Sequence, residues 1–145
     1  MPRFLSLLLF CCALGTGGAN AEEENIGDYT IHYIAVNSTF LAPEIAEQYG
    51  IVRGTRNAFL NIAVLRNNTD GSTTPVTATF TGNLHNLLQQ ETPIEFQEIH
   101  EGAAIYYIGQ FTFSDAEILT FTVDVQPEGQ GASHTLEWRA QLYAQ

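Results

Sequence analysis

The sequence has no lysine, and its only cysteines, Cys11 and Cys12, lie near the N-terminus. Its single methionine is Met1. Past residue 12 the chain therefore cannot form a disulfide or a soft, sulfur-ligated copper site. It also lacks the Gly-X-Ser-X-Gly motif of hydrolases, and its histidines show no paired metal-ligand spacing. These histidines are His32, His85, His100 and His134. We therefore predict no metal and no cofactor.

Positive charge is scarce. Past residue 21, four arginines stand against 16 aspartates and glutamates, a net charge of −12 with histidine neutral. The four are Arg53, Arg56, Arg66 and Arg139. Such a surface repels phosphate backbones and anionic lipid headgroups, so nucleic acid and membrane surfaces are poor partners. The charge favours solubility or the binding of a cationic partner.

The first 21 residues have the three parts of a secretory signal peptide. Arg3 precedes the apolar run Phe4–Leu14, and the small residues Ala19 and Ala21 follow. The run is too short to span a bilayer, which takes about 20 residues. Phe10 stands before Cys11, where lipid attachment needs a small residue. We predict export to the periplasm, cleavage after Ala21 and no membrane anchor afterwards.

Apolar and polar residues alternate along most of the chain after a flexible, acidic start at residues 22–27. One short helix is expected over Pro43–Tyr49, because proline suits the first helical turn and Gly50 suits a helix end. Residues 83–90 fit a strand or a helical turn, and we expect a strand. The other strands are expected over 29–36, 57–66, 75–81, 94–100, 103–113, 119–125 and 136–142.

Turns every eight to twelve residues predict one antiparallel all-β domain over residues 28–145. An immunoglobulin-like β-sandwich is the first expectation, and a lipocalin-like barrel is the second. The predicted core consists of Tyr33, Ile62, Phe80, Phe121 and Trp138.

Three stretches together carry a family resemblance: Asn37–Tyr49, Glu101–Ile108 and Val125–Pro127. In this order and spacing the chain resembles an uncharacterised family of exported gammaproteobacterial proteins, the domain of unknown function 4426. The resemblance covers essentially the whole chain after the signal peptide. It implies a periplasmic location and a single β-rich domain, and it brings no activity or catalytic residue.

A candidate binding site lies where the strand pattern is interrupted. Asn37 and Ser38 lead into the short helix, and Arg53 and Arg56 follow it. Asn61 then lies inside an apolar strand. Arginine binds carboxylates through two parallel hydrogen bonds, so the segment predicts a small anionic pocket or a site for a peptide C-terminus. Alternatively, the arginines pair with the surplus of acids and Asn37 or Ser38 caps a loop.

Two classes of function remain open. The first is a binding or assembly module whose partner is a cell-envelope protein or peptide. An exposed edge strand or an aromatic patch that uses Tyr106 and Tyr107 would favour it. The second is an enzyme whose site combines dispersed carboxylates with His100. His100 with Glu98 and Glu101 is the best local cluster of possible metal ligands, and in a strand Glu98 and His100 point to the same side. The oligomeric state is left open.

Overall fold

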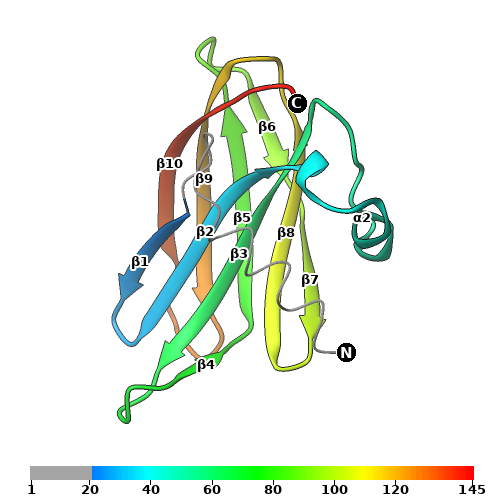
Figure 1. The fold of residues 1–145 in the computed structure, drawn as a ribbon. Helices are drawn as coiled ribbons and strands as arrows, with labels where there is room; N and C mark the ends of the chain where they lie inside the picture. The colour runs from blue at the N-terminus through cyan, green and yellow to red at the C-terminus, as the bar shows by residue number, and fades with distance from the viewer. Residues whose placement is uncertain (1–20) are drawn as a thin grey trace.

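The computed structural model describes residues 21–145, so the predicted signal peptide, up to residue 20, lies outside the described residues. Figure 1 shows two facing sheets with a helix beside one of them. The strands are β1 Glu22–Ile26, β2 Tyr29–Asn37, β3 Asn57–Asn67, β4 Thr73–Pro75, β5 Ala78–His85, β6 Glu91–Ile94, β7 Phe96–Glu101, β8 Ala104–Thr112, β9 Glu117–Pro127 and β10 His134–Leu142. The helices are the 3-10 helix η1 Ser38–Phe40 and the α-helix α2 Pro43–Tyr49.

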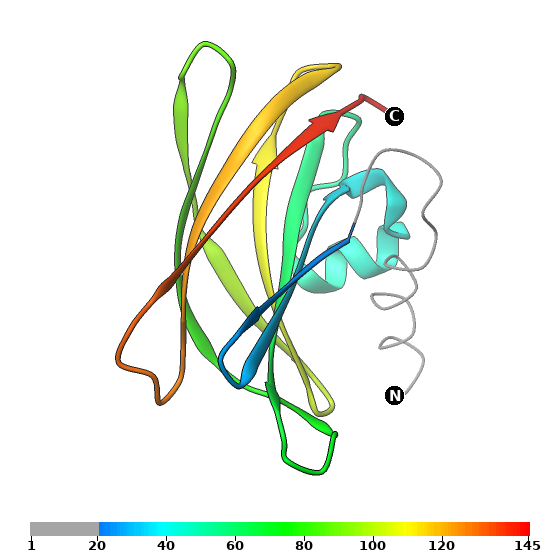
Figure 2. The same cartoon turned by 90° about the vertical axis from the view of Figure 1, so that its left-hand side faces the viewer.

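All strand pairs are antiparallel, and they form two sheets. Sheet A has the order β1-β2-β3-β8-β7, with β4 also paired to β3. Sheet B has the order β10-β9-β5-β6. This confirms the predicted all-β sandwich, and over the described residues the sheets do not close into a barrel (Figure 2). Within the same residues, no helix has the length and apolarity to cross a membrane.

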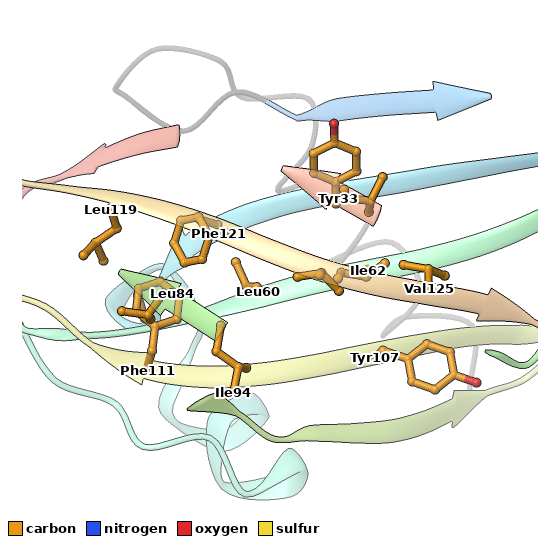
Figure 3. Packing of buried hydrophobic residues seen from close by; sticks show 14 of the residues in the cluster. Tyr33, Leu60, Ile62, Leu84, Ile94, Tyr107, Phe111, Leu119, Phe121 and Val125 are labelled. Carbon is orange, nitrogen blue, oxygen red and sulfur yellow. The ribbon is translucent and has the colours of Figure 1, made fainter. Parts of the chain in front are cut away.

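The main core fills the space between the sheets (Figure 3). Ile62 and Phe121 are fully buried, and Tyr33 is buried, as predicted. Phe80 and Trp138 are only partly buried and pack at the border of this core. Trp138 contacts the rings of Tyr33 and Phe121, with centroid distances of 4.5 and 5.1 Å.

Gly82 lies within a strand, not at the expected break between two segments. Strand β5 runs through it to His85, and the turn comes at residues 86–90. A Cβ atom at Gly82 would lie 3.1 Å from Val123 Cγ2 and 3.2 Å from Phe96 Cε2. The glycine therefore permits close packing where the chain crosses from sheet B to sheet A, between β6 and β7.

The acidic N-terminal segment is also a strand, although its composition predicts that residues 22–27 are flexible. Strand β1 pairs with β2 from Glu22 opposite Tyr33 to Ile26 opposite Tyr29. The side chain of Glu24 also lies 3.0 Å from His134 Nε2 in sheet B. The backbone hydrogen bonds between β1 and β2 hold this segment as a strand despite its three consecutive glutamates.

Helix α2 has the predicted bounds, and Gly50 ends it in the left-handed conformation at φ 68°. The helix lies on the outer face of sheet A (Figure 1). There a second apolar cluster forms beneath the segment that connects β2 to β3. Its buried members are Ile34, Val36, Leu41, Ile45, Ala46, Tyr49, Ile51, Phe59, Ile99, Tyr106 and Ile108.

Candidate functional site

The strand registers bring three connections and the C-terminal residues to one end of the sandwich. The end of β2 lies beside the start of β3, which lies beside the end of β8, because Asn37 pairs with Ala58 and Asn57 with Thr112. The ends of β5 and β10 lie beside the start of β9 in the same way. We call this the long-loop end; it comprises residues 38–56, 86–90, 113–116 and 143–145 (Figures 1 and 2).

The exposed large apolar side chains of the described residues all lie at the long-loop end. They are Phe40, Val52, Leu87, Leu88 and Tyr143, with exposed fractions from 46% to 80%. The turns of the opposite end, at residues 27–28, 68–72, 76–77, 102–103 and 128–133, carry none of them. Apolar exposure is therefore concentrated at one end of the molecule.

Ser38 and Asn37, two predicted site residues, fix the shape of this end. Ser38 is fully buried, and its Oγ donates to the carbonyl of Gly54 (3.0 Å) and accepts from the Gly54 N–H (2.9 Å). Asn37 is buried as well, and its Nδ2 donates to the carbonyl of Tyr143 at 2.7 Å. These bonds join the 38–56 segment to itself and to the C-terminus.

The two arginines of the segment are both exposed but differ in their contacts. Arg53 braces the turn before α2, since its Nε donates to Leu41 O (2.9 Å) and its Nη2 to Thr39 O (3.3 Å). Arg56 has no side-chain hydrogen bond within residues 21–145. In the same residues the ion pairs are all His–Glu pairs, so neither arginine is neutralised by an acid.

Gln110, which no sequence motif singled out, fixes the backbone of Gly50 and Val52, just before Arg53. Its Oε1 accepts from the Val52 N–H at 2.8 Å, and its Nε2 donates to the Gly50 carbonyl at 3.0 Å. The sequence signal that could have found it was a polar residue between Gly109 and Phe111 in a strand that is mostly apolar up to that point. Val52 is thereby presented outward on a fixed backbone.

The turn with Leu87 and Leu88 is likewise preformed. The Oδ1 of Asn86 accepts from the N–H groups of Leu88 and Gln90, both at 3.0 Å. The Nδ2 of Asn86 donates to Gln90 Oε1 at 2.8 Å. Asparagine at the start of a turn often makes such bonds. The two leucines therefore stand exposed on a turn whose shape is set by hydrogen bonds.

Tyr106, Tyr107 and Asn61 are buried, with exposed fractions of 5%, 4% and 9%. Strand β8, which carries the tyrosines, lies between β3 and β7. The expected exposed aromatic edge strand is therefore not formed, because alternate side chains of β8 enter the two apolar clusters. Asn61 lies in the outer face of sheet A, and its Oδ1 has no hydrogen-bond partner.

A partly buried hydrogen bond joins α2 to β7. The hydroxyl of Tyr49 donates to Glu101 Oε2 at 2.6 Å. Burial, and then the bond to Glu101, raise the pKa of Tyr49 to about 12. The other oxygen, Oε1 of Glu101, is buried without a partner. Tyr49 is thus the one polar anchor that the described structure shows between the helix and the Glu101 carboxylate.

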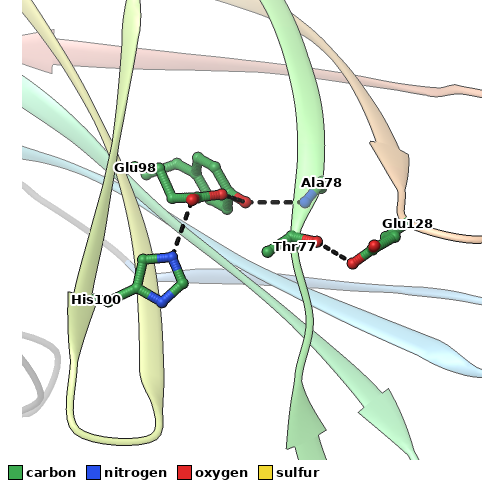
Figure 4. A network of polar contacts seen from close by, with 6 residues as sticks. Thr77, Ala78, Glu98, His100 and Glu128 are labelled. Atoms are coloured by element: carbon green, nitrogen blue, oxygen red, sulfur yellow. Dashed lines mark hydrogen bonds and ion pairs between the residues drawn. The ribbon is translucent and has the colours of Figure 1, made fainter.

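Glu98 and His100 point to the same side of β7, as predicted (Figure 4). The His100 Nε2 lies 2.9 Å from Glu98 Oε2, and the Tyr107 hydroxyl donates to Glu98 Oε1 at 2.5 Å. These two bonds lower the pKa of Glu98, while burial and Glu98 raise the pKa of Tyr107 to about 12. Nearby, Thr77 donates a hydrogen bond to Glu128.

The hydrogen bonds of the Glu98 cluster join three strands. The Tyr107 hydroxyl also accepts from the Ala78 N–H at 2.9 Å, so it links β7 and β8 to the start of β5. His100 has no hydroxyl or thiol nucleophile bonded to it within residues 21–145. In those residues no group of three His, Cys, Asp or Glu side chains could hold a metal ion.

Comparisons with known proteins agree with this fold. The model of the family described as domain of unknown function (DUF4426) matches residues 23–145. The crystal structure of a DUF4426 family protein from Pseudomonas aeruginosa PAO1 is similar over 86% of this chain and 96% of that chain, with 30% identity and a TM-score of 0.74. No curated protein matches the chain.

Two crystal structures of FetP from uropathogenic Escherichia coli strain F11 are similar in fold. FetP expressed in the periplasm has 8% identity and a TM-score of 0.61, covering 90% of this chain and 99% of that chain. A copper-bound FetP variant has 7% identity and a TM-score of 0.62, covering 89% and 100%. At such identity the likeness concerns the fold alone.

Proposed function

This chain belongs to the DUF4426 family. We propose that it is a periplasmic binding module that contacts a cell-envelope protein or peptide through its long-loop end. The observation that carries the proposal is that Phe40, Val52, Leu87, Leu88 and Tyr143 all lie at that end. The same end carries Arg53 and Arg56, which form no ion pair with an acid in residues 21–145.

Several physical arguments support a contact surface there. Exposed apolar groups that collect in one region of a protein mark interaction sites more often than scattered ones do. Aromatic residues and arginine are enriched in interfaces. The loops are held by Ser38, Asn37, Gln110 and Asn86, so a partner would meet a surface that is already ordered.

The charges suggest the chemistry of the partner. Within residues 21–145 the side chain of Arg56 forms no hydrogen bond or ion pair. The side chain of Arg53 donates from Nε and Nη2 to two backbone carbonyl groups. In a chain with 16 acids, this pair is a local attraction for a carboxylate. We therefore propose a partner segment that presents a carboxylate, either an acidic side chain or a C-terminus, next to apolar side chains.

The test measures binding to an immobilised array of peptides that combine apolar residues with acidic side chains or a free C-terminus. Arg56→Glu is the test variant, because no side-chain bond is lost with it. Arg66→Glu is the matched control: Arg66 is also exposed and unbonded through its side chain, but it lies at the opposite end of β3.

We expect that Arg56→Glu no longer binds the peptides that the natural protein and Arg66→Glu bind. An equal loss of peptide binding in both variants would show that net charge, not the long-loop end, drives binding. If the natural protein binds none of the peptides, the proposal is refuted. The location is tested separately by mass spectrometry of the periplasmic fraction, where a mature protein that begins at Glu22 is expected and retention of Met1 would contradict export.

A further inference from the structure

Strand β10 is a long sheet edge without the protection that the other edges have. It comprises nine residues, and it pairs with β9 without a bulge from His134 opposite Val125 to Leu142 opposite Glu117. In residues 21–145 no strand pairs with its other side. Such an edge presents a row of free N–H and C=O groups to another chain.

The other edge strands are short or blocked. Strand β1 has five residues, three of which are glutamates, and β7 has six residues with Glu98 and Glu101. Strands β4 and β6 have three and four residues and contain Pro75 and Pro93. Proline, short length and charge of one sign all discourage edge pairing. Strand β10 contains no proline, and its charges are of opposite sign.

The charged residues of β10 are Glu137 and Arg139, both exposed on the outer face of sheet B. Their neighbours on β9 are Thr122 and Thr120, and neither residue forms an ion pair in the described structure. Both charges thus lack a partner on the one strand that flanks them.

The inner face of β10 is also incompletely covered. Trp138 and Ala140 are only partly buried, although the residues opposite them, Phe121 and Leu119, are buried at 0% and 1% exposure. Trp138 packs against Tyr33 of sheet A and Phe121, but it and Ala140 keep some exposed apolar surface on this outermost strand of sheet B.

We propose that two copies of the chain associate antiparallel along β10, about a twofold axis at Trp138. This register places Glu137 opposite Arg139 of the second copy, and Arg139 opposite Glu137 of the second copy. Leu136 lies opposite Ala140 of the second copy on the inner face. Opposite charges across a strand pair stabilise it, and a parallel arrangement would juxtapose like charges instead. Sheet B becomes one continuous eight-stranded sheet.

This inference does not depend on the proposed function, because the β10 edge and the loop that carries Arg53 and Arg56 are different surfaces; of the exposed apolar residues of the long-loop end, Tyr143 alone directly follows β10. Arg56→Glu should leave association unchanged, and charge changes on β10 should leave peptide binding by each protomer unchanged. Failure of one proposal is therefore distinguishable from failure of the other.

The experiment measures the molecular mass of the purified protein, as the cell processes it, by sedimentation equilibrium over a range of concentrations. Four forms are compared: the natural protein, Glu137→Arg, Arg139→Glu and the double variant that swaps the two charges. Circular dichroism and thermal unfolding confirm that each form is folded.

We expect a dimer for the natural protein. Each single reversal replaces two attractions with two repulsions and should raise the dimer dissociation constant by roughly tenfold or more. The swapped double variant restores both attractions and should restore the dimer. A monomeric natural protein, or single reversals that dimerise as well as the natural protein, would overturn the proposal. If a single variant unfolds, failure of the folded double variant to dimerise would overturn it equally.

Discussion

The two sheets are buried to different extents. Sheet A is covered on both faces, by sheet B on one side and by the 38–51 region on the other. Sheet B is covered on one face only. In β3 residues 58–62 are all buried, whereas in β9 the buried Phe121, Val123 and Val125 alternate with less buried neighbours.

The difference comes from one long connection, between β2 and β3. Its α2 helix and flanking loops supply Leu41, Ile45, Ala46, Tyr49 and Ile51 to a second apolar cluster. The same connection carries Phe40, Val52 and the two arginines outward. A single segment therefore covers a sheet face and builds most of the long-loop end, which means that its packing and the proposed function are linked.

The largest effect is expected from Phe59→Ala, on the outer face of sheet A. Phe59 is 1% exposed, so its truncation should cost about 3–5 kcal/mol of unfolding free energy, as in a central core. Thr81→Ala, on the outer face of sheet B, is exposed and should change stability by about 0.5 kcal/mol or less. Urea unfolding measures both. Similar small costs would show that the outer face of sheet A is not a second core.

A smaller effect is expected from Ser38→Ala, which tests how the connection is held. The substitution leaves both the N–H and the carbonyl of Gly54 without their Ser38 partner. The expected loss is about 2–3 kcal/mol in urea unfolding. Ser72→Ala, at an exposed turn of the opposite end, is the control and should have little effect. Equal effects of the two substitutions would contradict a special role for Ser38.

The smallest of the three effects is expected from Tyr49→Phe, which removes the bond between α2 and Glu101. The loss should be about 1–2 kcal/mol near neutral pH. Tyr29→Phe, which changes a tyrosine with no side-chain hydrogen bond in the described structure, serves as the control. An equal loss in both variants would mean that the Tyr49–Glu101 bond contributes nothing of its own.

The Tyr49→Phe variant should also change how the stability of the protein depends on pH in alkaline solution. The pKa of Tyr49 is raised from 10.0 to about 12 in the folded protein. Stability from this group is therefore complete below pH 10 and is lost as pH rises through 12. Tyr49→Phe should lose less stability between these pH values than the natural protein does. The dependence of stability on pH that remains in this variant includes a contribution from Tyr107, whose pKa is also about 12. If stability fell equally with pH in Tyr49→Phe and in the natural protein, the raised pKa of Tyr49 would be contradicted.

The regular parts of the fold were predictable from local patterns. The alternation in residues 119–125 predicted β9 because one face of sheet B is solvated. Pro43 and Gly50 gave the bounds of α2 because both residues act through local backbone geometry. The same-side placement of Glu98 and His100 followed from the strand period of two.

The candidate site was less predictable. The sequence indicated the 37–56 segment, but it could not show that Asn37 and Ser38 point inward or that Arg53 bonds two carbonyl groups. Those contacts join residues distant along the chain. The burial of Tyr106 and Tyr107 likewise depended on β8 lying between β3 and β7, which no local pattern encodes.

The sequence by itself determined the strand content, the helix and the poverty in positive charge, because each depends on neighbouring residues or on composition. Only the tertiary structure decided that Phe40, Val52, Leu87, Leu88 and Tyr143 share one end, that Gly82 is a packing position and that β10 is left as an open edge. The physical reason is that strand order and register bring together residues far apart in the chain, and burial follows from that arrangement.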